Sequence, residues 1–116
     1  VEAFLIEQGL ADRFNRVYAT TDIVPGQIYL ELLPKGVTKG TALHECRSLA
    51  CFQGRTLIGV GDFNNDVELL EEADIAASPA NANDVIRTIT DVFLPSNNES
   101  AIAALIDRLS ETEAIR

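Results

Sequence analysis

The spacing of apolar and polar residues changes near residue 35 and divides the chain into two parts. In the first part, residues 1–10 end with Gly9 and are typical of the end of a helix. Residues 16–20 and 27–33 then read as two strands, separated by the turn-forming pair Pro25-Gly26. The first part therefore predicts a short helix followed by a β-hairpin.

The second hairpin strand alternates two sets of side chains. Tyr29, Glu31 and Leu33 would share one face. Ile28, Leu30 and Leu32 would share the other, so we expect these three to form the apolar face of the strand.

From residue 38 onwards, helix and strand patterns alternate. The expected elements are helix 38–50, strand 56–61, helix 65–73, strand 74–77, helix 82–88, strand 91–94 and a last helix. Thr38 is suited to cap the first helix, and Ser96 with Glu99 forms a capping box before the last. This order predicts an α/β fold in which parallel strands form a doubly wound sheet with helices on both faces. Three strands are few for such a sheet, so we expect a partial one.

Composition and charge argue against some classes of binding partner. The chain has 116 residues, 47% of them hydrophobic, and a net charge of −9, which repels nucleic acids and anionic membranes. We expect neither as a partner. Because the sequence lacks a run of about 18 apolar residues and a basic, apolar leader, we expect a cytoplasmic protein. It contains no methionine, so we expect residues to precede Val1.

Two cysteines, Cys46 and Cys51, lie five residues apart in the pattern of helix 38–50. That spacing turns their side chains about 140° apart around a helix axis, so we expect them to remain unpaired. His44 on the same helix lacks the partners that a metal site needs.

Candidate chemistry concentrates in residues 61–66, Gly-Asp-Phe-Asn-Asn-Asp, between a buried strand and a helix. Ligands of open parallel sheets bind beyond the carboxyl ends of the strands, where Asp62 would lie. Asp66, in the first helical turn, would point back to the same place. Two carboxylates arranged in this way suit Mg²⁺, which completes its coordination with water and substrate oxygens.

Two other interpretations of residues 61–66 remain. Asp62 and Asp66 are also residue types that cap a helix and favour its N-terminus for structural reasons alone. A calcium loop matches only at its first three ligand positions, because Val67 and Ala73 stand where glycine and glutamate are needed.

At this point the sequence resembles the Cof-type phosphatases of the haloacid dehalogenase superfamily, whose fourth motif reads Gly-Asp-x-x-Asn-Asp. The resemblance extends to residues 30–31, 34–40, 67–70, 80–82 and 96–99. It implies that residues 1–34 are the end of a cap domain and that residues 35–116 are the C-terminal part of the core domain.

The resemblance also implies roles for individual residues. Asp62 and Asp66 would hold Mg²⁺, directly or through water, and Asn65 would order the phosphate. Lys39 would be the cation of the third motif and would offset negative charge in the transition state. Spacing alone favours a solvated lysine at position 39, and Lys35 is a second candidate for the cation of the third motif.

The family's chemistry further requires an Asp-x-Asp segment that supplies the nucleophile, and these 116 residues contain none in the expected place. We therefore expect a fragment that is inactive by itself, from a phosphatase acting on sugar phosphates or other small phosphorylated metabolites. The alternative is a non-catalytic regulatory module that binds a cation or a phosphorylated ligand.

Overall fold

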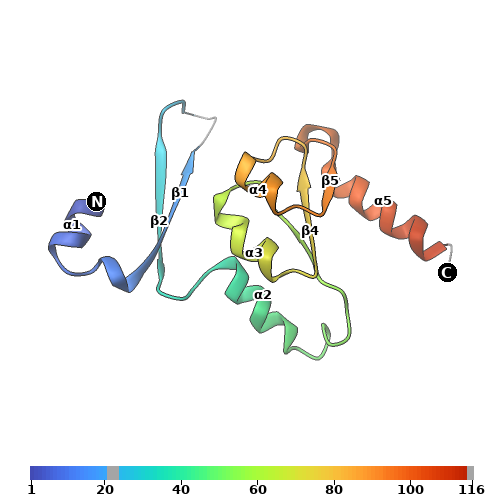
Figure 1. Ribbon diagram of the computed structural model, residues 1–116, viewed down its shortest axis with the longest axis horizontal. Coiled ribbons are helices and arrows are strands. Elements are labelled where there is room, and N and C mark those ends of the chain that lie inside the picture. Colours follow the sequence, from blue (N-terminus) through green and yellow to red (C-terminus); the bar gives the residue numbers. More distant parts are fainter. Residues whose placement is uncertain (21–23, 115–116) are drawn as a thin grey trace.

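The computed structural model describes residues 1–20 and 24–114. The chain is elongated, 59 Å in its longest dimension. A helix and a hairpin lie at one end, an α/β core occupies the middle, and the last helix reaches the other end (Figure 1).

The N-terminal part forms the predicted hairpin. Helix α1 (Glu2–Glu7) and a 3-10 turn (Ala11–Arg13) precede strands β1 (Phe14–Thr20) and β2 (Ile28–Pro34). The strands pair antiparallel, from Phe14 opposite Pro34 to Thr20 opposite Ile28.

The alternation predicted for β2 is confirmed, but its apolar face is not buried. Side chains opposite each other in an antiparallel pair share a face, so Leu32 lies on the side of Arg16, whose guanidinium is ion-paired with Glu2 of α1. Ile28 remains 68% exposed and Leu32 37% exposed. A two-stranded sheet with one short helix beside it supplies too little surface to cover this face.

The core has the predicted alternating order. It comprises α2 (Lys39–Arg47), β3 (Ile58–Val60), a 3-10 turn (Asn64–Asp66), α3 (Val67–Glu72), β4 (Ile75–Pro79), α4 (Asp84–Thr88), β5 (Val92–Leu94), a 3-10 turn (Asn97–Glu99) and α5 (Ala101–Ala114). The three strands are parallel in the order β3-β4-β5. The α/β fold with a parallel sheet flanked by helices is therefore confirmed.

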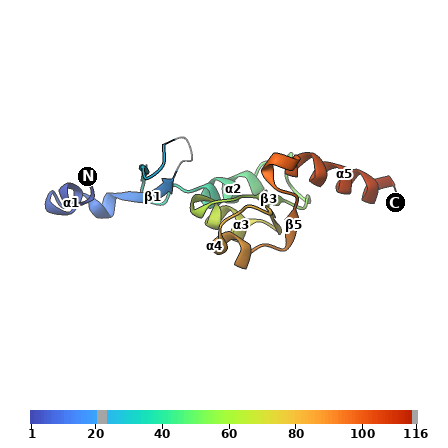
Figure 2. The ribbon, with the colours of Figure 1, turned by 90° about the horizontal axis from the view of Figure 1, so that it is seen from above.

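Helices cover both faces of the sheet (Figure 2). On one face Leu70 of α3 and Ile86 of α4 pack with Ala76 of β4. On the other, Ala101 of α5 packs with Ala77 and Leu94, and Leu105 lies against the same cluster. Consecutive residues of β4 are thus buried on opposite faces, which explains the continuous apolar run of this strand.

Helix α2 is fastened to the core at its C-terminal end. The guanidinium of Arg47 donates to the Glu72 carboxylate at 2.9 Å and to the Asp74 carboxylate at 3.1 Å. Asp74 in turn accepts a 2.7 Å hydrogen bond from the backbone N–H of Leu57, just before β3. These contacts fix the orientation of α2 and therefore the position of its first residue, Lys39.

Several predicted helix boundaries differ from the structure: α3 and α4 each begin two residues later than expected, and α2 ends three residues earlier. Helix α2 ends at Arg47, so Cys46 is helical whereas Cys51 lies in the turns beyond it. Both cysteines are free, as expected. The Ser96–Glu99 capping box is present, but it closes a 3-10 turn, and Ser100 then adopts a left-handed conformation (φ 61°) before α5 begins.

Within the described part of the chain, no helix has the length and apolar character that crossing a bilayer requires.

Candidate functional site

Asp62 stands at the carboxyl end of β3, where the sequence places it. Its backbone carbonyl accepts a hydrogen bond from the N–H of Asn83 at 3.1 Å, which ties the loop after β3 to the start of α4. Its side chain is exposed and has no hydrogen bond to any of the described residues. The Asp62 carboxylate is therefore available to a ligand.

Gly61 allows the chain to turn sharply at this point. A Cβ atom on residue 61 would lie 2.4 Å from the Cβ of Asp66, far inside van der Waals contact. Only glycine lets the strand end and the following turn approach so closely.

Asp66 is buried, 5% exposed, and both of its carboxylate oxygens are engaged. Oδ2 accepts the backbone N–H groups of Asp62 at 3.0 Å and Phe63 at 3.3 Å, and Oδ1 accepts from Lys39 Nζ at 2.5 Å. Burial alone would raise the pKa of Asp66, but the hydrogen bonds from Lys39 and the two backbone N–H groups outweigh it, and the pKa is lowered. Asp66 is therefore a buried, ionised anchor.

The interpretation in which these two aspartates only stabilise the start of a helix therefore fits Asp66 better than Asp62. Asp66 accepts from the backbone of its own loop, as a carboxylate in the first turn of a helix does. Asp62 makes no such contact among the described residues.

Lys39 enters the site from the first position of α2. Thr38 caps this helix: its hydroxyl accepts from the N–H of Thr41 at 3.1 Å, and the Thr41 hydroxyl accepts from the N–H of Thr38 at 2.9 Å. The Lys39 ammonium reaches Asp66, 27 residues further along the chain. Lys35 lies in the exposed turn after β2. Of the two lysines, Lys39 is therefore the one at the site.

Asn65 lies half-buried in the 3-10 turn between Asp62 and Asp66, where it lines a hollow together with Lys39. The structure thus brings Lys39, Asp62, Asn65 and Asp66 to one edge of the sheet.

Three further amide side chains hold the loops at this edge. Asn83 donates from Nδ2 to Asn64 Oδ1 at 2.7 Å, and its own Oδ1 caps α4 through the N–H of Ile86. Asn81 Oδ1 accepts from the backbone N–H of Asn97 at 2.9 Å. Sequence reasoning did not single out these contacts. The sequence feature that could have predicted these contacts is an asparagine shortly after each of the three parallel strands.

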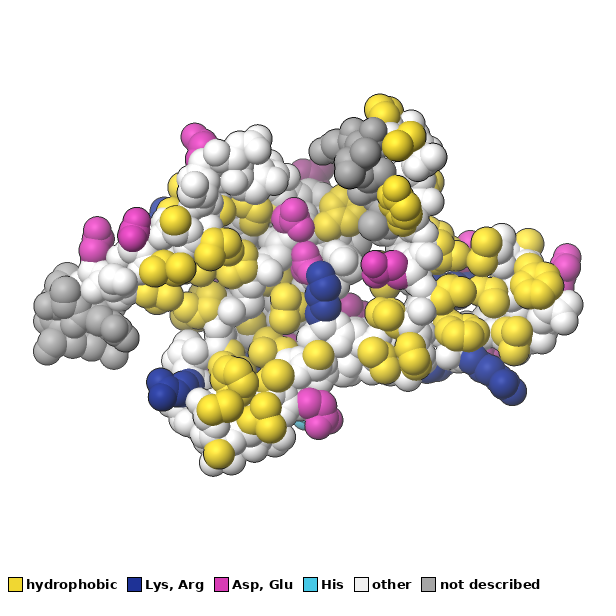
Figure 3. Space-filling model, turned by 180° about the vertical axis from the view of Figure 1, so that it is seen from behind, with side chains coloured by type: hydrophobic (Ala, Val, Ile, Leu, Met, Phe, Trp, Pro, Cys, Tyr) yellow, Lys and Arg dark blue, Asp and Glu magenta, His cyan; other side chains and the backbone are white. Residues whose placement is uncertain are grey.

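Two hollows adjoin at Lys39. One, of about 450 Å³, is lined by Asp62, Asp66, Pro79, Asn97 and residues 100–103 at the start of α5. The other, of about 330 Å³, lies between the hairpin and the core and is lined from the core side by Lys39, Asn65 and Glu68. In Figure 3 acidic and basic side chains gather near this junction between the hairpin and the core.

The side chains at this site match only part of the ligand set that Mg²⁺ takes. Mg²⁺ takes one or two carboxylates and keeps several waters or phosphate oxygens. Asp62 offers a free carboxylate, and Asp66 lies behind it with its oxygens already engaged. No group of three or more acidic, histidine or cysteine side chains suited to a metal occurs among the residues that the structure describes. The chemistry of these residues is therefore compatible with part of a magnesium shell.

Comparison with known proteins identifies the family. Residues 4–106 match the family model of haloacid dehalogenase-like hydrolases. The chain belongs to this family. The resemblance drawn from residues 61–66 and the neighbouring motifs is confirmed.

Relatives within this hydrolase family include several phosphatases. The chain is 35% identical over 78 residues to phosphoglycolate phosphatase 2 of Saccharolobus solfataricus, covering 67% of this chain and 33% of that protein. It is 27% identical over 94 residues to a 5-amino-6-(5-phospho-D-ribitylamino)uracil phosphatase of Bacillus subtilis, covering 81% and 37%. The chain thus spans about a third of the length of these relatives.

Several solved structures share the fold. A Streptococcus mutans protein superposes with a TM-score of 0.73 at 26% identity, over 95% of this chain and 41% of that one. A haloacid dehalogenase-like hydrolase of Bacteroides thetaiotaomicron gives 0.72 at 24% identity, over 93% and 38%. The hairpin and the core are therefore both included in the likeness.

Proposed function

We propose that this chain is the C-terminal part of a magnesium-dependent phosphatase that hydrolyses small, sugar-phosphate-like monoesters through an aspartyl-phosphate intermediate. The observation that carries the proposal is the Lys39–Asp66 ion pair beside the free carboxylate of Asp62, all at the carboxyl end of β3. The phosphatase names of the relatives support it. Because the chain spans about a third of those proteins, we place the nucleophilic aspartate in a segment upstream of Val1.

In this proposal Lys39 stabilises the transferring phosphoryl group. Its ammonium is held by Asp66, whose position is fixed in turn by two backbone N–H groups. A cation fixed in advance does not have to reorganise when negative charge develops on the phosphoryl oxygens. Asn65, which lines the hollow beside Lys39, would donate from its amide to a phosphate oxygen.

Asp62 is the proposed direct ligand of Mg²⁺, and Asp66 would act on the ion through water. This division follows from the contacts: Asp62 is free, whereas both oxygens of Asp66 already accept hydrogen bonds. The bound ion would neutralise the substrate phosphate and orient it toward the nucleophile.

We further propose that residues 1–34 belong to a cap domain and residues 35–116 to the core domain. The antiparallel hairpin and the parallel sheet are separate sheets, and the hollow between them opens beside Lys39. A hairpin in that place would face the leaving group of a substrate bound at Lys39.

The test is a magnesium-dependent assay of the whole protein with an aryl phosphate. Replacing Asp62 with asparagine should lower kcat/KM by roughly a hundredfold or more, because a metal ligand is lost. Asp84→Asn is the matched control: it removes the same charge from an exposed position in α4. Magnesium affinity, measured by calorimetry, should fall in Asp62→Asn and stay unchanged in Asp84→Asn.

The outcomes separate the proposal from its alternative. Near-normal turnover and magnesium affinity in Asp62→Asn would show that the metal site is assigned wrongly. A whole protein that binds Mg²⁺ and inorganic phosphate but turns over no monoester would favour a regulatory module. The 116-residue chain by itself should give no turnover, since it lacks the proposed nucleophile.

A further inference from the structure

The hollow between the hairpin and the core has two chemically different walls. The core wall carries Lys39 and Asn65, the residues proposed above to hold the phosphate. The hairpin wall includes Val17, Glu31 and Leu33. With a volume of about 330 Å³, the hollow falls at the small end of the range for small-molecule sites. A substrate whose phosphate lies at Lys39 would extend its leaving group toward the hairpin.

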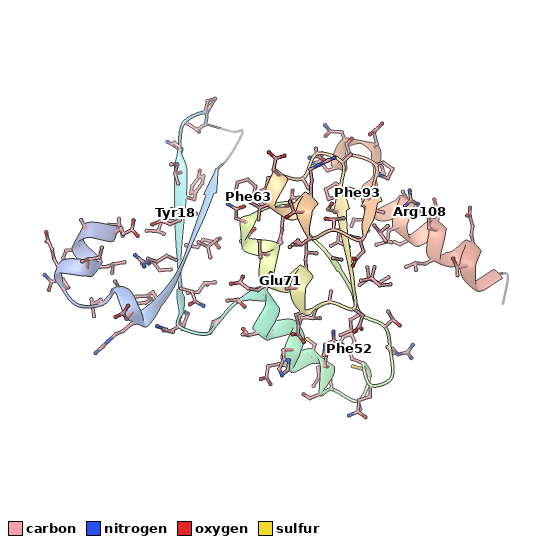
Figure 4. All side chains as sticks on the ribbon, in the orientation of Figure 1. Tyr18, Phe52, Phe63, Glu71, Phe93 and Arg108 are labelled. Carbon is pink, nitrogen blue, oxygen red and sulfur yellow. The ribbon has the colours of Figure 1, made fainter. Side chains whose placement is uncertain are left out.

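The strand register decides which side chains of the hairpin face this hollow. Glu31 pairs with Val17 and therefore shares its face, and Leu33, two residues further along β2, lies on the same face. Glu31 and Leu33 line the hollow, whereas their neighbours in the strand, Leu30 and Leu32, do not. Phe63, labelled in Figure 4, lies on the edge of the core that faces the hairpin. The Glu31 carboxylate thus belongs to the face that looks toward the core.

The charges around the hollow are unevenly balanced. Arg16 also borders it, but its register partner is Leu32, on the opposite face, and its guanidinium is 2.6 Å from the carboxylate of Glu2. The ammonium of Lys39 is ion-paired with Asp66. Among the described residues, neither Glu31 nor Glu68 forms an ion pair. The space next to the phosphate position is therefore lined by two carboxylates that have no ion-pair partner among the described residues, together with apolar side chains and the uncharged polar side chains of Asn15 and Thr38.

We infer that Glu31 determines substrate specificity by selecting the charge of the leaving group. A carboxylate accepts hydrogen bonds from hydroxyl groups and attracts an ammonium group, but it repels a second anion. The preferred substrates are then monoesters of neutral polyols or amino alcohols, and monoesters that carry a carboxylate are rejected. This inference rests on the proposed phosphatase function. It predicts a substrate preference different from the one in the names of the archaeal relatives, which are phosphoglycolate phosphatases.

Three substrates of nearly equal size test this inference in the whole protein. They are 2-phosphoglycolate, 2-hydroxyethyl phosphate and O-phosphoethanolamine, whose leaving groups carry charges of about −1, 0 and +1 at neutral pH. We expect kcat/KM to be lowest for the carboxylate and at least as high for the amine as for the alcohol. A single charge across a solvated hollow changes such a ratio by roughly five- to tenfold.

Glu31→Gln provides the decisive comparison, because it keeps the shape of the side chain and removes its charge. The ratio of kcat/KM for 2-phosphoglycolate to that for 2-hydroxyethyl phosphate should rise roughly fivefold. Glu45→Gln, which removes the same charge from an exposed position of α2, should leave the ratio unchanged. Increasing salt should shrink the wild-type preference, because screening weakens charge repulsion.

Each outcome has a distinct meaning. An unchanged ratio in Glu31→Gln, or a wild-type preference for 2-phosphoglycolate, overturns the inference while the phosphatase function stands. Hydrolysis of an aryl phosphate without hydrolysis of any of the three substrates also overturns it. Absence of turnover with every monoester, including the aryl phosphate, instead refutes the proposed function itself.

Discussion

At Gly40, the residue after Lys39, α2 lies very close to the backbone of α3. A Cβ atom at this position would lie 2.5 Å from the backbone oxygen of Glu68 and 2.7 Å from its carbonyl carbon. Ordinary van der Waals contact begins near 3.4 Å, so an added methyl group would be about 0.9 Å too close. Because the atoms in its way belong to the backbone, a change of rotamer cannot relieve the clash. We therefore expect Gly40→Ala to push the two helices apart.

The expected sign distinguishes this mechanism from helix propensity. In an unobstructed helix, replacing glycine with alanine stabilises by about 0.5 to 1 kcal/mol. Overpacking against a rigid neighbour costs about 1 to 3 kcal/mol. For Gly40→Ala the second effect should win and lower the free energy of unfolding by about 1 to 2 kcal/mol. Urea unfolding followed by far-ultraviolet circular dichroism measures this change, since the chain has no tryptophan.

The control comes from the solvent-exposed face of the same helix. Glu45 is exposed, and the difference in stability between Glu45→Ala and Glu45→Gly measures propensity in α2 without a clash. If Gly40→Ala were as stable as the wild type or more so, the tight contact between α2 and Glu68 would be refuted. In the whole protein the same substitution should also reduce kcat/KM, because it shifts the end of α2 that carries Lys39.

Two further predictions concern stability. Ile86 is the fully buried residue of α4, and its replacement with alanine should lower the free energy of unfolding by about 2 to 5 kcal/mol. Replacement of its exposed neighbour Val85 with alanine should lower it by about 0.5 kcal/mol or less. Equal losses in urea unfolding would contradict the assigned core. The pKa of Asp74 is lowered by hydrogen bonds from the Leu57 N–H and then from Arg47. A lowered pKa in the folded state contributes stability that is present above the unfolded pKa of about 3.9 and is lost as pH falls further. The stability difference between wild type and Asp74→Asn should therefore shrink below about pH 4, and a difference independent of pH would refute this linkage.

Local patterns predicted most elements of the fold. The parallel strands follow from short apolar runs alternating with helical periodicity, and both faces of β4 are buried as such a run implies. The hairpin register keeps Glu31 and Leu33 on one face, as the alternation indicated. Burial of the hairpin was not predictable from alternation, because it depends on what packs against the sheet. Ile28 shows this most clearly, since it is apolar, lies on the expected face and remains 68% exposed.

Helix ends and long-range contacts were harder to predict. The Ser96–Glu99 capping box is a local signal and was found, but the left-handed Ser100 that delays α5 has no local signature. Lys39 and Asp66 are 27 residues apart, so spacing cannot pair them. Only the resemblance to a family brought both residues to one site. The engagement of both Asp66 oxygens by Lys39 and the backbone required the structure.

The charges at the proposed site favour the binding of a divalent cation there. Lys39 contributes one positive charge, and Asp62 and Asp66 contribute one negative charge each. Since Lys39 and Asp66 neutralise each other, the free Asp62 leaves the site negative. A phosphomonoester dianion would be repelled by that site, within a chain of net charge −9. A magnesium ion on Asp62 reverses the sign, so binding of substrate and binding of magnesium should strengthen each other. The exposed, unpaired state of Asp62 is the feature that makes this coupling possible, because the charge of an ion-paired carboxylate such as Asp66 is already balanced by a lysine.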